Sequence, residues 1–254
     1  MEWYTTESGK YRVESLSAET FPGALKVIQE AFCQDEAVSI GSEVNKDPAA
    51  QEELLELCAD AALDGVSLVA IEVSSSEVVA VAFNKLQVQS PEKTFFDVFV
   101  EERCNRPSSK SLIQFMSNVD ARCNLFEKHQ ADCSLEIMFL ATFREHRKQN
   151  LGTILCKLSV DLARKLKNGP VSKITLEDLG SKYSHMKPRE VTNKVPKICQ
   201  AIWTGEFTQR IGAKLGFNVE VKALMSEFNH NGKTYADRLG DQAAYSEVVS
   251  LVLD

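Results

Sequence analysis

Residues 135–167 read LEIMFLATFREHRKQNLGTILCKLSVDLARKLK, and the rest of the chain is organised around this stretch. Its first part is an almost continuous apolar run, which is typical of a central strand covered on both faces. Its last part carries apolar residues at the spacing that makes one stripe on a 3.6-residue period. This stripe consists of Leu151, Ile154, Leu155, Leu158, Leu162 and Leu166. The stretch therefore predicts a buried strand, a short connection and an amphipathic helix.

The connection between the predicted strand and the predicted helix is basic. It contains Arg144, His146, Arg147 and Lys148, directly before the helix. The first N–H groups of a helix have no partner within the helix, and the helix dipole is positive at that end, so a basic loop there suits a phosphate group. An ordinary solvated loop has the same composition, and the loop residues alone leave both interpretations open.

Composition indicates an ordinary globular protein. The chain has 254 residues, of which 44% are hydrophobic, and we expect a single domain over residues 1–254. No window approaches the run of about 20 apolar residues that a membrane span needs, and the first residues do not have the form of a signal peptide. We therefore expect a soluble, cytoplasmic protein without a membrane partner. The net charge of −7 argues against nucleic acid as the main partner.

Cysteine and histidine give no sign of a metal site or of disulfides. The seven cysteines are dispersed and odd in number, without a CxxC pair, so reduced buried thiols are the default. The four histidines show no metal-ligand spacing, and we predict no metal.

Periodicity and turn signals along the chain predict a mixed α/β fold. Strands are expected at 10–16, 66–73, 78–87, 135–142, 197–203, 217–228 and 245–253. Helices are expected at 20–32, 48–64, 110–128, 151–167 and 205–215, and a polar connection around Pro91 and Pro107 leads to the third of them. Residues 169–195 show no clear pattern and are expected to form a surface excursion, longer than most loops.

The basic loop resembles the cofactor signature of the GCN5-related N-acetyltransferase superfamily. That signature has Arg or Gln, two residues, Gly, one residue, then Gly or Ala, directly after a buried strand. The matching residues here are Arg147 to Gly152, with Asn150 in the place of the first glycine. Asn tolerates a left-handed backbone better than most other non-glycine residues, so the turn is expected to survive.

Two further segments are similar to the insect arylalkylamine N-acetyltransferase group. In FCQDEA, residues 32–37, Glu36 matches the acidic residue that serves as general base, and Ala37 follows where proline is usual. In AIWTGEFTQRIGAKLGF, residues 201–217, Thr204 and Thr208 match two hydroxyl residues that face the acetyl-transfer site. Taken alone, Glu36 would be a routine helix end and the threonines would be helix-capping hydroxyls. Phe32 and Trp203 flank these residues, either as packing or as walls of an aromatic-amine pocket.

The resemblance implies a fold and a set of site residues. The fold is a twisted, mostly antiparallel mixed sheet of about seven strands, flanked by helices, with two strands splayed at the cofactor site. The co-substrate is acetyl-CoA, without a metal. The implied catalytic residues are Glu36, Thr204 and Thr208, and the implied cofactor-binding residues are Leu140, Ala141, Thr142, Arg147, Lys148, Gln149, Asn150, Leu151, Gly152 and Thr153.

The resemblance also implies a reaction, in which acetyl-CoA acetylates the primary amine of a small arylalkylamine such as dopamine, serotonin or tyramine. The amine arrives as a cation with a pKa near 10, so a base must remove a proton before the nitrogen attacks the thioester directly in a ternary complex. Other acceptors such as agmatine or a polyamine, another acyl-CoA, or a CoA-binding module with little activity remain as alternatives. The expected partners are the amine and acetyl-CoA, and the expected state is a monomer or a weak dimer.

Overall fold

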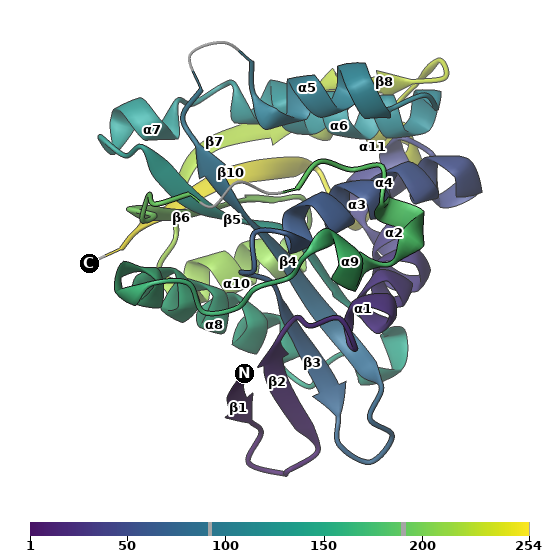
Figure 1. The fold of residues 1–254 in the computed structure, drawn as a ribbon. Helices are drawn as coiled ribbons and strands as arrows, with labels where there is room; N and C mark the ends of the chain where they lie inside the picture. Colours follow the sequence, from purple (N-terminus) through teal and green to yellow (C-terminus); the bar gives the residue numbers. More distant parts are fainter. Residues whose placement is uncertain (91–92, 189–191, 254) are drawn as a thin grey trace.

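The computed structural model describes residues 1–90, 93–188 and 192–253 (Figure 1). Their main feature is an eight-stranded sheet in the order β1-β2-β3-β4-β5-β6-β10-β7, in which only β5 and β6 pair in parallel. Its strands are β1 (Glu2–Thr5), β2 (Tyr11–Ser15), β3 (Leu68–Glu72), β4 (Val78–Val88), β5 (Cys133–Thr142), β6 (Ile198–Trp203), β7 (Asn218–Leu224) and β10 (Tyr245–Val252). The predicted mostly antiparallel mixed sheet is confirmed, and β1 is an additional edge strand.

Helices cover both faces of this sheet, as Figure 1 shows. On one face, α8 (Leu151–Lys165) packs on β3, β4 and β5, and α10 (Glu206–Leu215) packs beside it on β6. The other face carries α1 (Phe21–Val27), α4 (Pro48–Ala62), α5 (Phe95–Arg103) and α6 (Pro107–Asp120). Each face has its own apolar core, because the strands are buried on both sides.

The remaining elements are short. They are α2 (Cys33–Asp35), α3 (Ala37–Gly41), α7 (Leu125–Lys128), α9 (Leu176–Leu179), α11 (Tyr235–Leu239) and a two-stranded ribbon of β8 (Asn229–His230) and β9 (Lys233–Thr234). Within the region 169–195, α9 is followed by a 3₁₀ turn at Ser181–Tyr183, and Leu179, Tyr183 and Met186 are buried in the core. Residues 189–191 of that region lie outside the described residues.

Local sequence signals fix where the long helices of the α4 face begin. The Asp47 carboxylate accepts hydrogen bonds from the N–H groups of Ala49 and Ala50 and so caps α4. Thr94 and Asp97 form a reciprocal capping box at the start of α5. The Glu53 carboxylate, on α4, accepts the backbone N–H groups that precede α6, so it ties the start of one helix to the side of another.

Several predicted helix boundaries are wrong. The helix expected at 110–128 begins at Pro107 and ends at Asp120, and Asn124 then caps the separate α7. The connection before it holds α5, which was not predicted, while residues 91 and 92 lie outside the described residues. The strand expected at 217–228 ends at Leu224, and the short α11 after it was missed.

The first helix is also interrupted. A π-helical turn at Ile28–Phe32 follows α1, α2 continues from it, and Glu36 then takes an extended conformation before α3. A π-helical turn inside a helix is often found at a functional site. The interruption places Glu36 on a corner between two helices instead of on an exposed helix end.

The two central strands separate in the middle of the sheet. β5 and β6 pair at only three positions, and the last pair is Glu136 with Gln200. Beyond that pair, β5 continues along β4 as far as Thr142, and β6 continues along β10 as far as Trp203. The register of β5 against β4 also shifts beside Met138, which marks a β-bulge. The predicted splayed strands are confirmed, and the gap between them beyond Glu136 and Gln200 forms a fork in the sheet.

A buried carboxyl lies at the base of the fork. Glu136 is 1% exposed, and burial raises its pKa to about 8, with the nearby Asp120 carboxyl adding to the effect. Gln87 donates a hydrogen bond of 2.6 Å from Nε2 to Oε2 of Glu136. Burial likewise raises the pKa of Asp120 to about 6. These two carboxyl groups therefore retain protons that exposed carboxyl groups would lose.

We expect Glu136→Gln to change the pH dependence of stability. An unfolded glutamate ionises near pH 4.3, so at higher pH, up to about 8, the folded protein holds a proton that the unfolded chain has released. The free energy of unfolding of the wild type should therefore fall as pH rises through this window, by at most about 1.4 kcal/mol per pH unit for this group. Urea unfolding between pH 5.5 and 9 should show that the free energy of unfolding of the variant does not fall in this way above pH 6. The variant should therefore be the more stable protein at pH 8.

Glu177, exposed on α9, offers the matched control, because Glu177→Gln should leave the wild-type profile unchanged. A wild-type stability that stays flat between pH 6 and 8 would contradict the assignment of a protonated Glu136.

Candidate active site at the fork of the sheet

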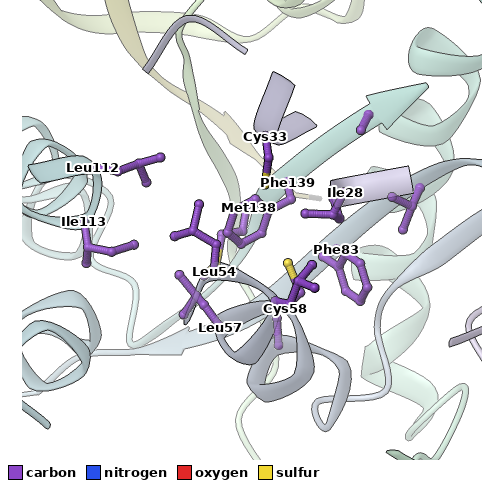
Figure 2. Packing of buried hydrophobic residues seen from close by; sticks show 14 of the residues in the cluster. Ile28, Cys33, Leu54, Leu57, Cys58, Phe83, Leu112, Ile113, Met138 and Phe139 are labelled. Carbon is purple, nitrogen blue, oxygen red and sulfur yellow. The ribbon is translucent and has the colours of Figure 1, made fainter. Parts of the chain in front are cut away.

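A cleft opens at the fork and runs inward between the sheet and the helices of the α4 face. It encloses about 580 Å³ including its open mouth. Its lining residues are Phe32, Glu36, Val38, Leu57, Phe96, Leu112, Ile113, Met116, Ile137, Met138, Phe139, Leu140, Ile202, Trp203, Thr204 and Thr208. Figure 2 shows how side chains from α4 and α6, among them Leu57 and Leu112, gather around Met138 and Phe139 of β5.

Glu36 is held at the mouth of this cleft by three hydrogen bonds. Its carboxylate accepts the N–H groups of Val38 at 2.8 Å and Ser39 at 2.6 Å, and so caps α3. The hydroxyl of Thr204, at the end of β6, donates to Oε1 of Glu36 at 2.6 Å. The carboxylate is therefore fixed in position between the two sides of the fork.

Thr204 and Thr208 also line the cleft. The hydroxyl of Thr208 donates to the carbonyl oxygen of Gly205 at 2.9 Å, which holds it in the first turn of α10. The structure thus brings together the three residues predicted as catalytic, and their chemical roles stay predictions. Phe32 and Trp203 also line this cleft, as expected if they form walls of a pocket rather than only packing in the core.

The residues predicted to contact the pantetheine lie on the open edge of β5. Leu140, Ala141 and Thr142 pair with Ala82, Val81 and Ala80 of β4 on one side. On the other side they lie beyond the last pair with β6, so that edge faces the fork. A β-strand edge of this kind is suited to an extended amide chain, because it offers alternating N–H and C=O groups.

The basic loop follows directly. Arg144 and Arg147 both form ion pairs with Asp35 at the end of α2, and Arg147 also donates from Nε to the carbonyl oxygen of Thr142 at 3.1 Å. Hydrogen bonds from Arg144, and then from Arg147, hold the pKa of the Asp35 carboxyl below its usual value. On its other side the loop is tied to β2, because the Tyr11 hydroxyl and Nδ1 of His146 lie 3.0 Å apart.

The turn into α8 has the left-handed conformation expected at Asn150. Asn150 has a φ of 62° and a ψ of 11°, and its side chain makes no capping hydrogen bond with the helix. Lys148 is also left-handed, and residues 147–150 are exposed. Leu151, Gly152 and Thr153 then form the first turn of α8, whose N–H groups are the kind that bind phosphate.

Close packing joins this turn to the rest of the site. A Cβ atom on Gly152 would lie 3.2 Å from Cδ1 of Ile211 on α10, so a larger residue at the start of α8 would have to displace that side chain. A Cβ atom on Gly212 would lie 2.4 Å from Nε1 of Trp203, at the end of β6. Glycines therefore set the approach of α8 to α10 and of α10 to the fork.

Two features of the site were not predicted from sequence. Asp35 was noted only as part of a polar patch, and its pairing with the basic loop depends on a contact more than 100 residues away in the chain. Phe96 of α5 was missed with its helix, whereas Leu112, Ile113 and Met116 were expected only as a core stripe. Apolar periodicity identifies a buried face but does not say whether a cleft or packed side chains lie against it.

Burial makes the cysteines of this region poor nucleophiles. Cys33, the cysteine nearest to Glu36 in sequence, is buried, and burial raises its pKa to about 12. Burial also raises the pKa of Cys199 on β6 far above its usual value. No group of three or more His, Cys, Asp or Glu side chains in the described part of the chain has the arrangement of a metal site. Within the same residues, no helix has the length and apolar character that a membrane span requires.

Solved structures of similar shape are known. One is a putative arylalkylamine N-acetyltransferase 7 from the mosquito Aedes aegypti, with 18% identity, a TM-score of 0.75, and coverage of 100% of this chain and 95% of that one. A second is arylalkylamine N-acetyltransferase 2 of the same mosquito, with 18% identity, a TM-score of 0.74 and coverage of 96% and 99%. A third is a polyamine N-acetyltransferase of Drosophila melanogaster described as forming N-acetylagmatine, with 13% identity, a TM-score of 0.71 and coverage of 96% and 100%.

The sequence matches no family model and none of the curated proteins. The structural likeness, at these identities, shows that the chain has the fold of the GCN5-related N-acetyltransferases.

The left-handed turn before α8 predicts a graded response to substitution at Asn150. Asn150→Ala should lower the free energy of unfolding by about 1 kcal/mol, because alanine is strained in this conformation, whereas Asn150→Gly should stay within about 0.5 kcal/mol of the wild type. Gln149→Ala, at the neighbouring exposed position, serves as the control and should be neutral. Urea unfolding at one pH decides the matter, and an alanine variant as stable as the glycine variant would refute a strained turn.

Proposed function

We propose that a protein with this fold and this cleft is an acetyl-CoA-dependent N-acetyltransferase that acetylates the primary amine of a small arylalkylamine. The observation that carries the proposal is the Glu36–Thr204 pair, which lies at the mouth of the fork between the open edge of β5 and the first turn of α10. A base can deprotonate the amine, a hydroxyl can hydrogen-bond the thioester oxygen or the leaving sulfur, and a free strand edge can pair with the amide groups of the pantetheine.

The binding of acetyl-CoA is assigned to the predicted residues. The pyrophosphate would bind the first turn of α8 and the basic loop, at Arg147 to Thr153. The pantetheine arm would pair with Leu140 to Thr142, which have no β6 partner. The ion pairs that hold Arg144 and Arg147 to Asp35 lie at the surface, with 67% and 43% of the arginine side chains exposed, so giving them up for phosphate costs little.

The proposed reaction is a direct transfer. Glu36 takes a proton from the ammonium group of the substrate, directly or through a water molecule, and the nitrogen lone pair attacks the thioester carbonyl carbon. The C–S bond breaks as the carbonyl re-forms, the nitrogen gives up its second proton, and the CoA thiolate takes up a proton and leaves as the thiol. In this proposal the hydroxyl of Thr204 or Thr208 exchanges its present acceptor, Glu36 or the carbonyl of Gly205, for the thioester carbonyl oxygen or the departing sulfur. No acyl-enzyme is needed, in agreement with the high pKa of the buried Cys33.

The composition of the cleft favours an arylalkylamine over agmatine or a polyamine. Glu36 is the only acidic residue among the described residues that line it, and most of the others are apolar. A monoamine can place its cation beside Glu36 and its body against hydrocarbon. A second cation, as in agmatine, would lie in an apolar wall without a carboxylate partner, which is costly.

A thiol-release assay tests this function. Purified protein with acetyl-CoA should release CoA in the presence of arylalkylamines and release much less with agmatine or spermidine. If none of these amines leads to release of CoA, while calorimetry shows that CoA still binds, the transferase is contradicted and a CoA-binding module is favoured.

The same assay tests the general base. Glu36→Gln should lower kcat by about 100- to 1,000-fold near neutral pH, since the amide cannot take the proton. The loss should shrink as pH rises toward the pKa of the amine, because more of the substrate then arrives as the free base.

Asp47→Asn is the matched control for helix capping. Asp47 also caps a helix with its carboxylate, at the start of α4, but it does not line the cleft. Its loss should reduce stability and leave kcat unchanged. An unchanged kcat in Glu36→Gln would remove Glu36 from the mechanism.

A further inference from the structure

The inner wall of the cleft is built almost wholly of hydrocarbon. Leu57 of α4, Phe96 of α5, and Leu112 and Ile113 of α6 line it, and none is more than 3% exposed. Figure 2 shows Leu112 and Ile113 to the left of Met138, and Leu57 below it. This wall lies inward of Glu36, where the body of a bound amine would be placed.

The carboxylate and hydroxyl side chains of the lining all have hydrogen-bond partners within the protein. Glu36 accepts from Thr204 and from two backbone N–H groups, and Thr208 donates to the carbonyl oxygen of Gly205. Among the described lining residues, no other side chain can both donate and accept hydrogen bonds as a phenol requires. The indole N–H of Trp203 is buried without a hydrogen-bond partner in the described part of the chain and packs against Gly212, and it can donate a hydrogen bond but cannot accept one.

Three hydroxyl groups of α6 have partners outside the lining. Ser109 donates to Glu53 of α4, and the Ser111 hydroxyl lies 2.7 Å from that of Tyr235 on α11. Ser117 donates to Asp97 of α5 at 2.5 Å. The residues that α6 gives to the cleft are Leu112, Ile113 and Met116. This helix therefore divides its polar and apolar faces between its helical neighbours and the cleft.

We infer that the acceptor site selects an amine whose body is unsubstituted hydrocarbon, such as 2-phenylethylamine or an alkylamine, and discriminates against ring hydroxyls. The inference rests on the proposed function and narrows it. A phenol entering this wall exchanges its hydrogen bonds with water for contacts with hydrocarbon. A hydrophobic site rejects an added hydroxyl by about 10- to 100-fold in kcat/KM.

Three amines make a matched series for the test. 2-Phenylethylamine, tyramine and dopamine share one ethylamine chain and one ring, and they carry zero, one and two ring hydroxyls. With acetyl-CoA, kcat/KM should fall at least about 10-fold from the first to the second and fall again to the third. Calorimetry of the same amines with CoA-saturated protein should give Kd values that rise from phenylethylamine to tyramine to dopamine, whether or not the protein turns them over.

A pair of variants tests where the ring lies. Met116 is only partly buried, so Met116→Gln brings an amide into the lining at similar length, whereas Met116→Leu keeps it apolar. Met116→Gln should lower the ratio of kcat/KM for phenylethylamine to kcat/KM for tyramine at least about threefold, because the amide gives the phenol a hydrogen-bond partner. Met116→Leu should leave this ratio unchanged. Circular dichroism checks that both variants are folded. A ratio that Met116→Gln leaves unchanged would count against a ring placed beside α6.

The outcomes separate this inference from the function beneath it. No turnover, with amine binding in the stated order, would contradict the transferase and support the apolar acceptor site. Turnover in which tyramine or dopamine equals or exceeds phenylethylamine would overturn the inference and leave the transferase standing. If transfer from hexanoyl-CoA is faster than from acetyl-CoA and the amines show no ranking, the apolar wall binds the acyl chain. That result would also overturn the inference about the amine.

Discussion

The separation of β5 from β6 after three residue pairs is the constraint on which the rest of the site depends. Each strand keeps a partner on its outer side, β4 for β5 and β10 for β6, so both stay ordered while their inner edges part. Phe32 packs edge-on against Phe139 of β5, with ring centroids 5.0 Å apart, and Trp203 of β6 packs against Gly212 of α10. The two sides of the fork thus pack against different helical segments.

Adjacent residues at the break in the first helix serve the two sides of the fork. Asp35 faces the basic loop after β5 and pairs with Arg144 and Arg147, while Glu36 turns toward β6 and accepts from Thr204. The extended conformation of Glu36 between α2 and α3 is what turns the two side chains toward different partners. One corner of the chain therefore connects the region assigned to the cofactor phosphates with the region assigned to the amine.

The sequence could reveal the elements that repeat a simple pattern and could not reveal those that depend on distant contacts. The apolar run of β5 and the stripe of α8 predicted both elements, and Asn150 was expected in the left-handed conformation that it adopts. The grouping of Glu36 with Thr204 came from resemblance, since residues 168 positions apart have no local signal of contact. The interruption at Glu36, the short α11 and the helix α5 were missed because capping and tertiary packing, rather than periodicity, decide them. The core stripe of α6 was identified, but not that it forms the wall of a cleft.

The claim that the fork receives CoA is tested most directly by hydrogen–deuterium exchange with and without CoA. Exchange should slow on CoA binding in two segments: the end of β5 at residues 138–142, whose open edge would pair with the pantetheine, and the turn at 147–154 that would hold the pyrophosphate. Protection confined to other parts of the protein, such as the groove between α10 and the β7 edge of the sheet, would contradict it.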